Sequence, residues 1–280
     1  IEILESDVDD ISVLKKFVNE YRSLGFMIAL DDFGAGFSNW DRIVSLKPDL
    51  IKLDRSIIDG IESDFYKQEV ARSIIKLAHN TGSMVIAEGI EEEEESLKVL
   101  ELNTDMLQGY LFGRPSGIAS LDTGSILETI NSISSRYITS RNERYLKEEN
   151  EINRFIRIIG RITDALVIGE LYLPEETLKA MIKNDPIIEC AYILDSSGIQ
   201  TSETVINSMI KNSRSRIFQR DEPGSDQSNK DYFYSLMNGH KTHITDPYIS
   251  TATGNLCITI SKKYIDPEGE SRILCVDIKK

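Results

Sequence analysis

Acidic side chains recur at or near the ends of short apolar runs in the first part of the sequence: Glu2, Glu5, Asp31, Asp32, Asp54 and Glu88. A lysine, Lys52, lies inside one of these runs, and an amide side chain, Gln108, lies at the last. Carboxylates with an amide offer oxygen ligands that suit Mg²⁺ or Mn²⁺, whereas zinc prefers histidine and cysteine. Such a group suits phosphate-ester chemistry, because two metal ions can activate a water molecule and stabilise the leaving oxygen.

These side chains can meet only if the apolar runs are neighbouring strands. We predict strands over residues 1–4, 26–30, 50–54, 84–89 and 107–112. Helical spacing of apolar residues separates them over 9–24, 39–46, 67–80 and 91–102. Apolar strands that alternate with helices are typical of parallel β/α architecture, an α/β fold whose sheet is buried on both faces. Because the carboxyl ends of such strands share one face, we expect the acids, the lysine and the amide to converge there.

A simpler interpretation treats each acid as a turn residue or a helix N-cap. That interpretation suits an isolated aspartate or glutamate. It does not explain the adjacent carboxylates of Asp31 and Asp32, or a lysine inside an apolar strand. The glycines Gly34 and Gly36 fit either a loop that folds over the site or a tight turn.

Four motifs taken together resemble the EAL family of bacterial phosphodiesterases, which linearise cyclic di-GMP. They are Asp31-Asp32-Phe33-Gly34-Ala35-Gly36-Phe37-Ser38, Lys52-Leu53-Asp54, Ala87-Glu88-Gly89-Ile90-Glu91 and Gln108-Gly109-Tyr110-Leu111-Phe112. The opening Glu2-Ile3-Leu4-Glu5-Ser6 resembles the family's E-x-T-E segment, with leucine in place of threonine. The resemblance extends from Glu2 to about Pro115.

The resemblance implies metal ligands and catalytic residues. The metal ligands would be Glu2, Asp31 and Asp32, and the ions would be Mg²⁺ or Mn²⁺. Lys52 would contact the nucleophilic water, and Glu88 would act on the metal site. Glu5 would hold the loop from Asp32 to Ser38, which in this family couples dimer contacts to the active site.

It also implies a substrate, a product and an assembly. The substrate would be cyclic di-GMP, the product linear pGpG and the assembly a homodimer. The substrate-binding residues would be Phe33, Gly34, Asp54, Gln108 and Gly109.

The sequence departs from the family pattern in one respect. The family's Glu-Ala-Leu strand, a nearby arginine and a metal-binding asparagine precede the E-x-T-E segment, and none is present in this sequence. The family fold is a TIM-like (β/α)8 barrel of about 250 residues. Residues 1–118 correspond to its second half, from the fifth strand to the eighth. Half a barrel leaves two strand edges unpaired, so we expect either a fragment of a longer protein or a half-barrel that pairs with another segment.

Two functional interpretations follow. In the first, the protein hydrolyses cyclic di-GMP under the control of a second domain, and this chain alone, which lacks the upstream half, does not do so at a normal rate. In the second, the protein is a catalytically inactive cyclic di-GMP receptor, or a dimerisation and interaction module.

The remainder of the sequence predicts a helical linker over residues 119–170 and a sensor domain over 171–280. The helical pattern covers 125–168, and its apolar stripe favours a connecting helix over a coiled-coil partner. Strands at 188–195, 256–263 and 272–278, with a short helix at 232–237, indicate an α+β domain with helices on one side of an antiparallel sheet.

The segments 231–234 and 245–248 and the closing hairpin resemble PAS-like sensor domains of the Cache type. They resemble more closely the signalling domain that follows EAL in a family from Gram-positive bacteria. The resemblance implies a pocket for an unidentified small molecule near Tyr232, Tyr234 and Tyr248. Aromatic residues at this spacing are more often part of a core than of a pocket.

Composition limits the partners of the chain. It carries 46 acidic and 32 basic residues, a formal net charge of -14, which argues against nucleic acid or an anionic membrane as a partner. Three scattered cysteines make no disulfide framework and favour the reducing cytoplasm. No apolar run approaches the roughly 20 residues of a membrane span.

Overall fold

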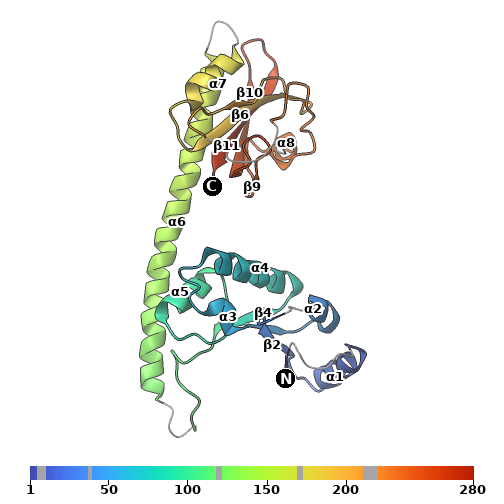
Figure 1. Cartoon of the computed structure of the whole chain (residues 1–280), viewed down its shortest axis with the longest axis vertical. Coiled ribbons are helices and arrows are strands. Elements are labelled where there is room, and N and C mark those ends of the chain that lie inside the picture. Colours follow the sequence, from blue (N-terminus) through green and yellow to red (C-terminus); the bar gives the residue numbers. More distant parts are fainter. Residues whose placement is uncertain (5–10, 37–39, 118–121, 169–172, 211–219) are drawn as a thin grey trace. The chain divides into compact units, whose positions relative to one another are not determined.

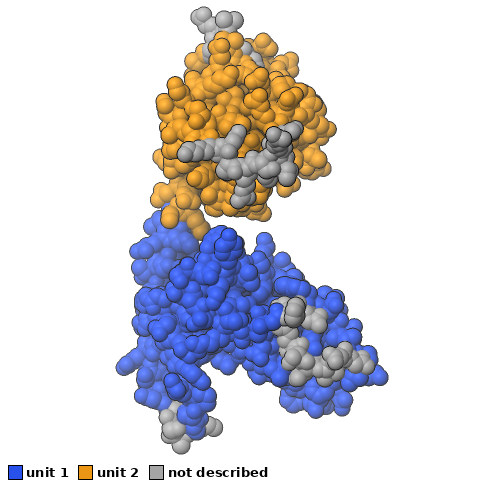
Figure 2. Space-filling view, viewed as in Figure 1, with its two compact units in different colours: residues 1–146 blue, residues 147–280 orange. Residues whose placement is uncertain are grey.

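The computed structural model describes residues 1–4, 11–36, 40–117, 122–168, 173–210 and 220–280. The chain divides into two compact units, residues 1–146 and 147–280 (Figure 2). Each unit has its own hydrophobic core. Glu5 and the segment 37–39, to which the sequence assigned a role in loop control, lie outside the described residues. Among the described residues, no helix combines the length and the apolar character that crossing a bilayer requires.

The first unit is built on a parallel sheet of five strands in sequential order (Figure 1). The strands are β1 (Glu2–Leu4), β2 (Ala29–Phe33), β3 (Leu50–Leu53), β4 (Met84–Ala87) and β5 (Met106–Leu107). A parallel sheet in this order fits part of a TIM-like barrel, although the expected half-barrel has four strands and the described sheet has five. The predicted α/β class is therefore confirmed for this unit.

Three predicted strands have the wrong bounds, and one of them, β4, ends at Ala87 and not at Gly89. β2 begins at Ala29, not at Phe26, because the Phe26 amide bonds to the Tyr21 carbonyl at the end of the preceding helix. Asp31 therefore lies within the strand and not after it. The last strand is only Met106–Leu107, and the predicted continuation to residue 112 forms turns instead.

Helices join successive strands of this sheet. They are α1 (Ile11–Ser23), α2 (Trp40–Leu46), α3 (Arg55–Ile58), α4 (Phe65–Thr81) and α5 (Glu93–Glu101). The bounds of α4 follow from its caps: Asp64 accepts hydrogen bonds from two first-turn amides, and Gly82 adopts φ 83° at the C-terminal end. Apolar residues of the central strands, such as Ile51, Leu53 and Val85, are fully buried against the helices.

A single 45-residue helix, α6 (Thr123–Val167), contributes to both units. Its first part is attached to α5: Arg136 forms ion pairs with Glu93 and Glu94, and Ser140 donates a hydrogen bond to Glu101. Its last turns enter the core of the second unit through Ile158, Ile159, Ile162 and Leu166. The segment between these two attachments is mostly exposed.

The second unit is an antiparallel sheet in the order β7-β6-β11-β10-β8, with β9 paired to β10. The elements are α7 (Pro174–Ile182), β6 (Ile188–Asp195), β7 (Val205–Ile206), α8 (Asp231–Met237), β8 (Thr242–Ile244), β9 (Tyr248–Ile249), β10 (Leu256–Ile265) and β11 (Ser271–Lys279). The helices do not lie on one side as predicted. Helices α6 and α7 pack with Ala191 and Ile193 of β6, whereas α8 packs with Tyr192 and Leu194, which alternate to the opposite face.

The turn after β5 offers a test of the first unit. Gly109 lies against Ile90, and a Cβ at this position would be 2.0 Å from the Ile90 carbonyl oxygen. We expect Gly109→Ala to lower the free energy of unfolding of this unit by about 2 kcal/mol, because the backbone of Ile90 would have to move. Trp40, the single tryptophan of the chain, reports on this unit, so urea unfolding followed by its fluorescence measures the loss.

Gly36→Ala is the matched control, because no atom lies within 4 Å of the Cβ that it would add. Equal unfolding midpoints for the two variants would show that the contact with Ile90 does not restrict residue 109.

Candidate functional site

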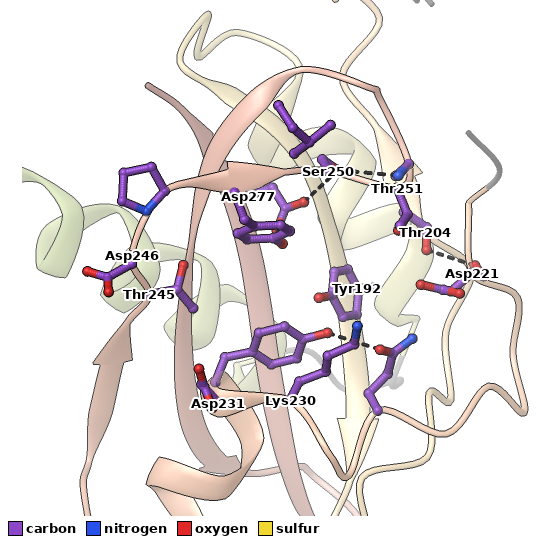
Figure 3. A pocket seen from close by; sticks show the side chains of 16 residues that line it. Tyr192, Thr204, Asp221, Lys230, Asp231, Thr245, Asp246, Ser250, Thr251 and Asp277 are labelled. Atoms are coloured by element: carbon purple, nitrogen blue, oxygen red, sulfur yellow. Dashed lines mark hydrogen bonds between the residues drawn. The ribbon is translucent and has the colours of Figure 1, made fainter. Parts of the chain in front are cut away.

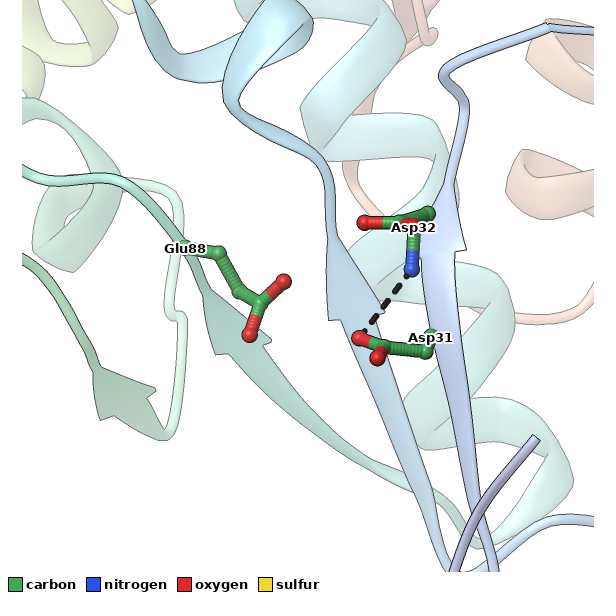
Figure 4. A group of neighbouring side chains, drawn as sticks. All are labelled: Asp31, Asp32 and Glu88. Atoms are coloured by element: carbon green, nitrogen blue, oxygen red, sulfur yellow. Dashed lines mark hydrogen bonds between the residues drawn. The ribbon is translucent and has the colours of Figure 1, made fainter. Parts of the chain in front are cut away.

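Three carboxylates converge where the strands of the first unit end (Figure 4). Asp31 and Asp32 belong to β2, and Glu88 directly follows β4. One oxygen atom of each lies within 4.8 Å of the others, and all three side chains are only partly exposed. Oxygen atoms at this spacing could share a divalent cation.

Lys52 of β3 lies between these carboxylates. Its ammonium nitrogen is 2.7 Å from Asp31 Oδ1, 2.6 Å from Glu88 Oε1 and 3.1 Å from Glu2 Oε1. Its side chain is 5% exposed. Burial by itself would lower the pKa of Lys52, but the bonds to the three carboxylates outweigh burial and raise it. Lys52 is therefore a fixed positive charge at neutral pH.

One lysine does not balance the negative charge of this site. Burial raises the pKa of Glu88, and the ion pair with Lys52 offsets that effect only in part. Burial, followed by the charges of Asp31 and Asp54, raises the pKa of Asp32. Both carboxyl groups thus hold protons more tightly than usual, as expected where a further cation would be stabilising.

The backbone at Asp32 brings two adjacent side chains to one place. In a regular strand, Asp31 and Asp32 would point to opposite faces. Asp32 instead has φ 51°, in the left-handed region, and the pairing of β2 with β3 shifts register between Leu30 and Phe33. A positive φ costs free energy at a non-glycine residue, although aspartate tolerates it better than most. The strain is therefore located at the candidate site itself.

The other residues predicted for the metal and substrate sites lie around this centre. The Glu2 carboxylate reaches Lys52, but its side chain is 60% exposed. Phe33 is buried in the core, and a Cβ on Gly34 would meet Ile57. Asp54 caps α3 by accepting a 2.8 Å hydrogen bond from the Ser56 amide.

The residues predicted after β5 lie on a turn fixed by backbone hydrogen bonds. The backbone amide of Gln108 donates to the Ala87 carbonyl, and the backbone carbonyl of Gln108 accepts from the Ile90 amide. The Gln108 side chain is exposed beside the end of β4. Gly109 packs against Ile90 as described above. These contacts give Phe33, Asp54 and Gly109 structural roles, and their predicted roles in substrate binding remain predictions.

Two interactions beside the site were not foreseen from the sequence. Arg55 pairs with Glu91, and Gly89 with φ 70° lies so close to Arg55 that a Cβ would be 2.8 Å from it. Arg114 lies over the ring of Tyr110, 4.9 Å from its centroid. Position in the sequence could have indicated the first of these interactions. Arg55 directly follows the Lys52-Leu53-Asp54 motif, and Glu91 ends the motif that begins at Ala87.

The ion pairs of Lys52 predict a stability effect. Lys52→Met would leave Asp31 and Glu88 without their positive partner, and we expect the first unit to lose about 3 kcal/mol of unfolding free energy. Trp40 fluorescence during urea unfolding measures this change.

Lys98→Met is the control, and Lys98 pairs with Glu101. Glu101 keeps Ser140 and Arg144 as further partners, so the loss should cost under about 1 kcal/mol. Similar losses in both variants would contradict a special role for the Lys52 cluster.

The second unit contains a cavity of about 370 Å³ (Figure 3). Tyr232 of α8 and Tyr248 of β9 line it, as does Tyr192 of β6, which the sequence did not indicate. Tyr234 does not line this cavity: it is 65% exposed and lies on a shallower depression with His243. The structure therefore brings together two of the three tyrosines predicted to form a pocket.

Asp277 of β11 also lines this cavity, with 2% of the residue exposed. Its carboxylate accepts hydrogen bonds from Thr259, Ser250, Tyr248 and the Cys190 thiol. Burial raises the pKa of Asp277, and these donors offset the increase only in part. The folded chain therefore binds a proton here more tightly than the unfolded chain does.

This difference predicts a pH dependence. Tighter proton binding by Asp277 stabilises the folded chain. This stabilisation is complete below pH 3.8, the ordinary pKa of the group, and is lost as pH rises through the raised pKa of the folded chain. Asparagine cannot ionise, so the stability of Asp277→Asn relative to the parent chain should increase as pH rises from 3.8 towards neutrality. Hydrogen exchange of peptides from β10 and β11 at several pH values measures this difference. A difference that does not vary with pH would contradict the assignment.

Comparison with known proteins relates this geometry to a family. Residues 1–115 match the model of the EAL domain family. Cyclic di-GMP phosphodiesterase PdeF of Escherichia coli (strain K12) is 35% identical over 130 residues, which cover 46% of this chain and 17% of that protein. Cyclic di-GMP phosphodiesterase PdeA of Borreliella burgdorferi is 35% identical over 119 residues, 42% of this chain and 18% of that protein. The chain thus spans less than a fifth of the length of either relative.

A solved structure resembles the whole chain. The crystal structure of the Bacillus subtilis YkuI protein, which has an EAL domain and is in complex with substrate c-di-GMP and calcium, aligns with a TM-score of 0.78. The alignment covers 100% of this chain and 69% of that chain at 23% identity, and it therefore shows the fold. The comparisons together support a relationship of residues 1–115 to EAL-domain cyclic di-GMP phosphodiesterases.

Proposed function

We propose that this protein is a signalling phosphodiesterase of the EAL class, which hydrolyses cyclic di-GMP to linear pGpG with divalent metal ions. The observation that carries the proposal is the convergence of Asp31, Asp32 and Glu88 around the buried Lys52, within a segment that matches the EAL family. The names of the relatives PdeF and PdeA support the same substrate, as does the YkuI complex with c-di-GMP.

The residues present fit a divalent metal. Asp31, Asp32 and Glu88 supply hard oxygen donors. Burial, followed by the neighbouring carboxylates, raises the pKa of Asp32, and burial raises the pKa of Glu88. These donors suit Mg²⁺ or Mn²⁺. With Glu2 on the neighbouring strand they would hold the metal, which would supply the charge that activates water and steadies the leaving oxygen.

The chain's own groups would position the reactants. Lys52 stays protonated, and its three N–H groups point at Glu2, Asp31 and Glu88. If one of these carboxylates bound a metal instead, the released N–H would donate a hydrogen bond to the oxygen of the attacking water and hold it beside Asp31. The exposed side chain of Gln108 lies on a turn that backbone hydrogen bonds attach to β4, and it is available to the substrate. Both groups act by orientation, which lowers the entropic part of the barrier.

We also propose that the second unit is a PAS/Cache-like sensor that controls this site. An antiparallel sheet with a lined cavity and the continuous helix α6 support the proposal. The EAL resemblance favours action as a homodimer. A cytoplasmic location suits the three cysteines, which are free and buried.

Calorimetric titration of cyclic di-GMP into the chain, with and without Ca²⁺, tests this function. We expect metal-dependent binding that weakens about tenfold or more in Asp31→Asn and Asp32→Asn, because each variant removes a metal ligand. Glu69→Gln is the control, since Glu69 is exposed on the surface of α4 and its carboxylate pairs with Arg72, away from the carboxylate cluster. Absence of metal-dependent binding would overturn the proposal.

Turnover distinguishes the remaining alternatives. Conversion to linear pGpG with Mg²⁺ or Mn²⁺ is followed by chromatography under the same conditions. Binding with turnover would support the phosphodiesterase. Binding without turnover would favour the receptor interpretation for this chain, and the enzyme assignment would then fall unless the complete EAL domain that contains these residues turns over substrate.

A further inference from the structure

More acidic than basic side chains line the cavity of the second unit. Asp221, Asp231, Asp246 and Asp277 supply four carboxyl groups, against the single ammonium of Lys230. Figure 3 shows Asp231 and Asp246 on one side of the cavity and Asp221 on the other. Carboxyl groups therefore lie on two sides of the space.

Two exposed carboxylates of the lining are available to a ligand. Among the described residues, the side chains of Asp231 and Asp246 make no ion pair or hydrogen bond, and both residues are exposed. Asp277 differs from them, because its oxygens already accept four hydrogen bonds and it is almost completely buried. The oxygens of Asp277 are thus occupied by the chain's own donors, whereas the exposed aspartates can contact a charged group directly.

The tyrosines offer aromatic surface and not free hydroxyl groups. The Tyr232 hydroxyl donates to Gln227, and the Tyr248 hydroxyl bonds to Thr259 and Asp277. The rings of Tyr192 and Tyr232 pack edge to face with centroids 6.3 Å apart. The π electrons of tyrosine attract cations, and aromatic rings beside carboxylates are a common way to bind ammonium groups.

We propose that this cavity binds a small organic cation, a metabolite that carries an ammonium or quaternary ammonium group. The cation would lie against the tyrosine rings, with Asp231 and Asp246 as its counter-ions. The site lies apart from the phosphodiesterase residues, and only its regulatory meaning rests on the proposed sensor role. The competing possibility is an organic anion bound through Lys230.

Choline and putrescine are suitable probes, with 3,3-dimethylbutan-1-ol as the neutral isostere of choline. Binding to the full chain is measured by calorimetry without cyclic di-GMP, so that failure of the phosphodiesterase proposal does not affect the result. We expect at least one cation to bind saturably, and the neutral isostere to bind at least tenfold more weakly than choline if choline is that cation. Higher salt should weaken cation binding, because it screens the exposed carboxylates.

Two variants locate the contact. Asp231→Asn and Asp246→Asn should each raise the Kd of the bound cation about two- to fivefold, the effect expected for a partly solvated charge contact. Glu268→Gln is the matched control, because it removes the same charge from an exposed turn of the same unit outside the cavity. An equal change of Kd in all three variants would show that general electrostatic attraction accounts for the binding, and it would overturn the proposed site.

Three further results would also overturn the proposal. They are failure of both cations to bind, equal binding of choline and its neutral isostere, and binding of malonate that Lys230→Gln abolishes. The last result would assign the cavity to an organic anion instead.

Discussion

The buried ammonium group of Lys52 is the interaction on which the first unit depends. An unpaired charge in this position would cost several kcal/mol, and its partners come from different strands: Glu2 from β1, Asp31 from β2 and Glu88 from the end of β4. The contacts form only with β3 next to β2 and β4 in the observed register. The same ion pairs therefore favour one arrangement of the sheet and assemble the carboxylates of the candidate site.

Much of this arrangement could be predicted, because it depends on local patterns. The alternation of apolar strands and helices predicts the parallel sheet, and polar residues at the strand ends predict where Asp31, Glu88 and Lys52 meet. The conformation of Asp32 could not be predicted, since its positive φ arises from a register shift between neighbouring strands. Periodicity likewise could not show that Phe33 would be buried, because its motif carries both core and site residues.

The errors in the second unit have a different physical origin. Strand β6 is buried on both faces, so its sequence shows no alternation that could tell on which face α8 packs. Tyr234 was grouped with Tyr232, but residues two apart on a helix point in different directions. The structure accordingly places Tyr232 in the cavity and leaves Tyr234 exposed. Helical geometry alone would have separated these two residues once the helix was predicted.

The attachment of α6 to α5 bears on how a sensor could act on the site. Arg136 binds the first turn of α5 through Glu93 and Glu94. In the same turn, the Glu95 carboxylate accepts hydrogen bonds from the amides of Glu91 and Glu92, in the segment that follows Glu88. A displacement of α6 would therefore act on the backbone that carries Glu88 before it reached Asp31 or Asp32. Because Glu88 also pairs with Lys52, a small shift there would change the ion pair between these two residues at the candidate site.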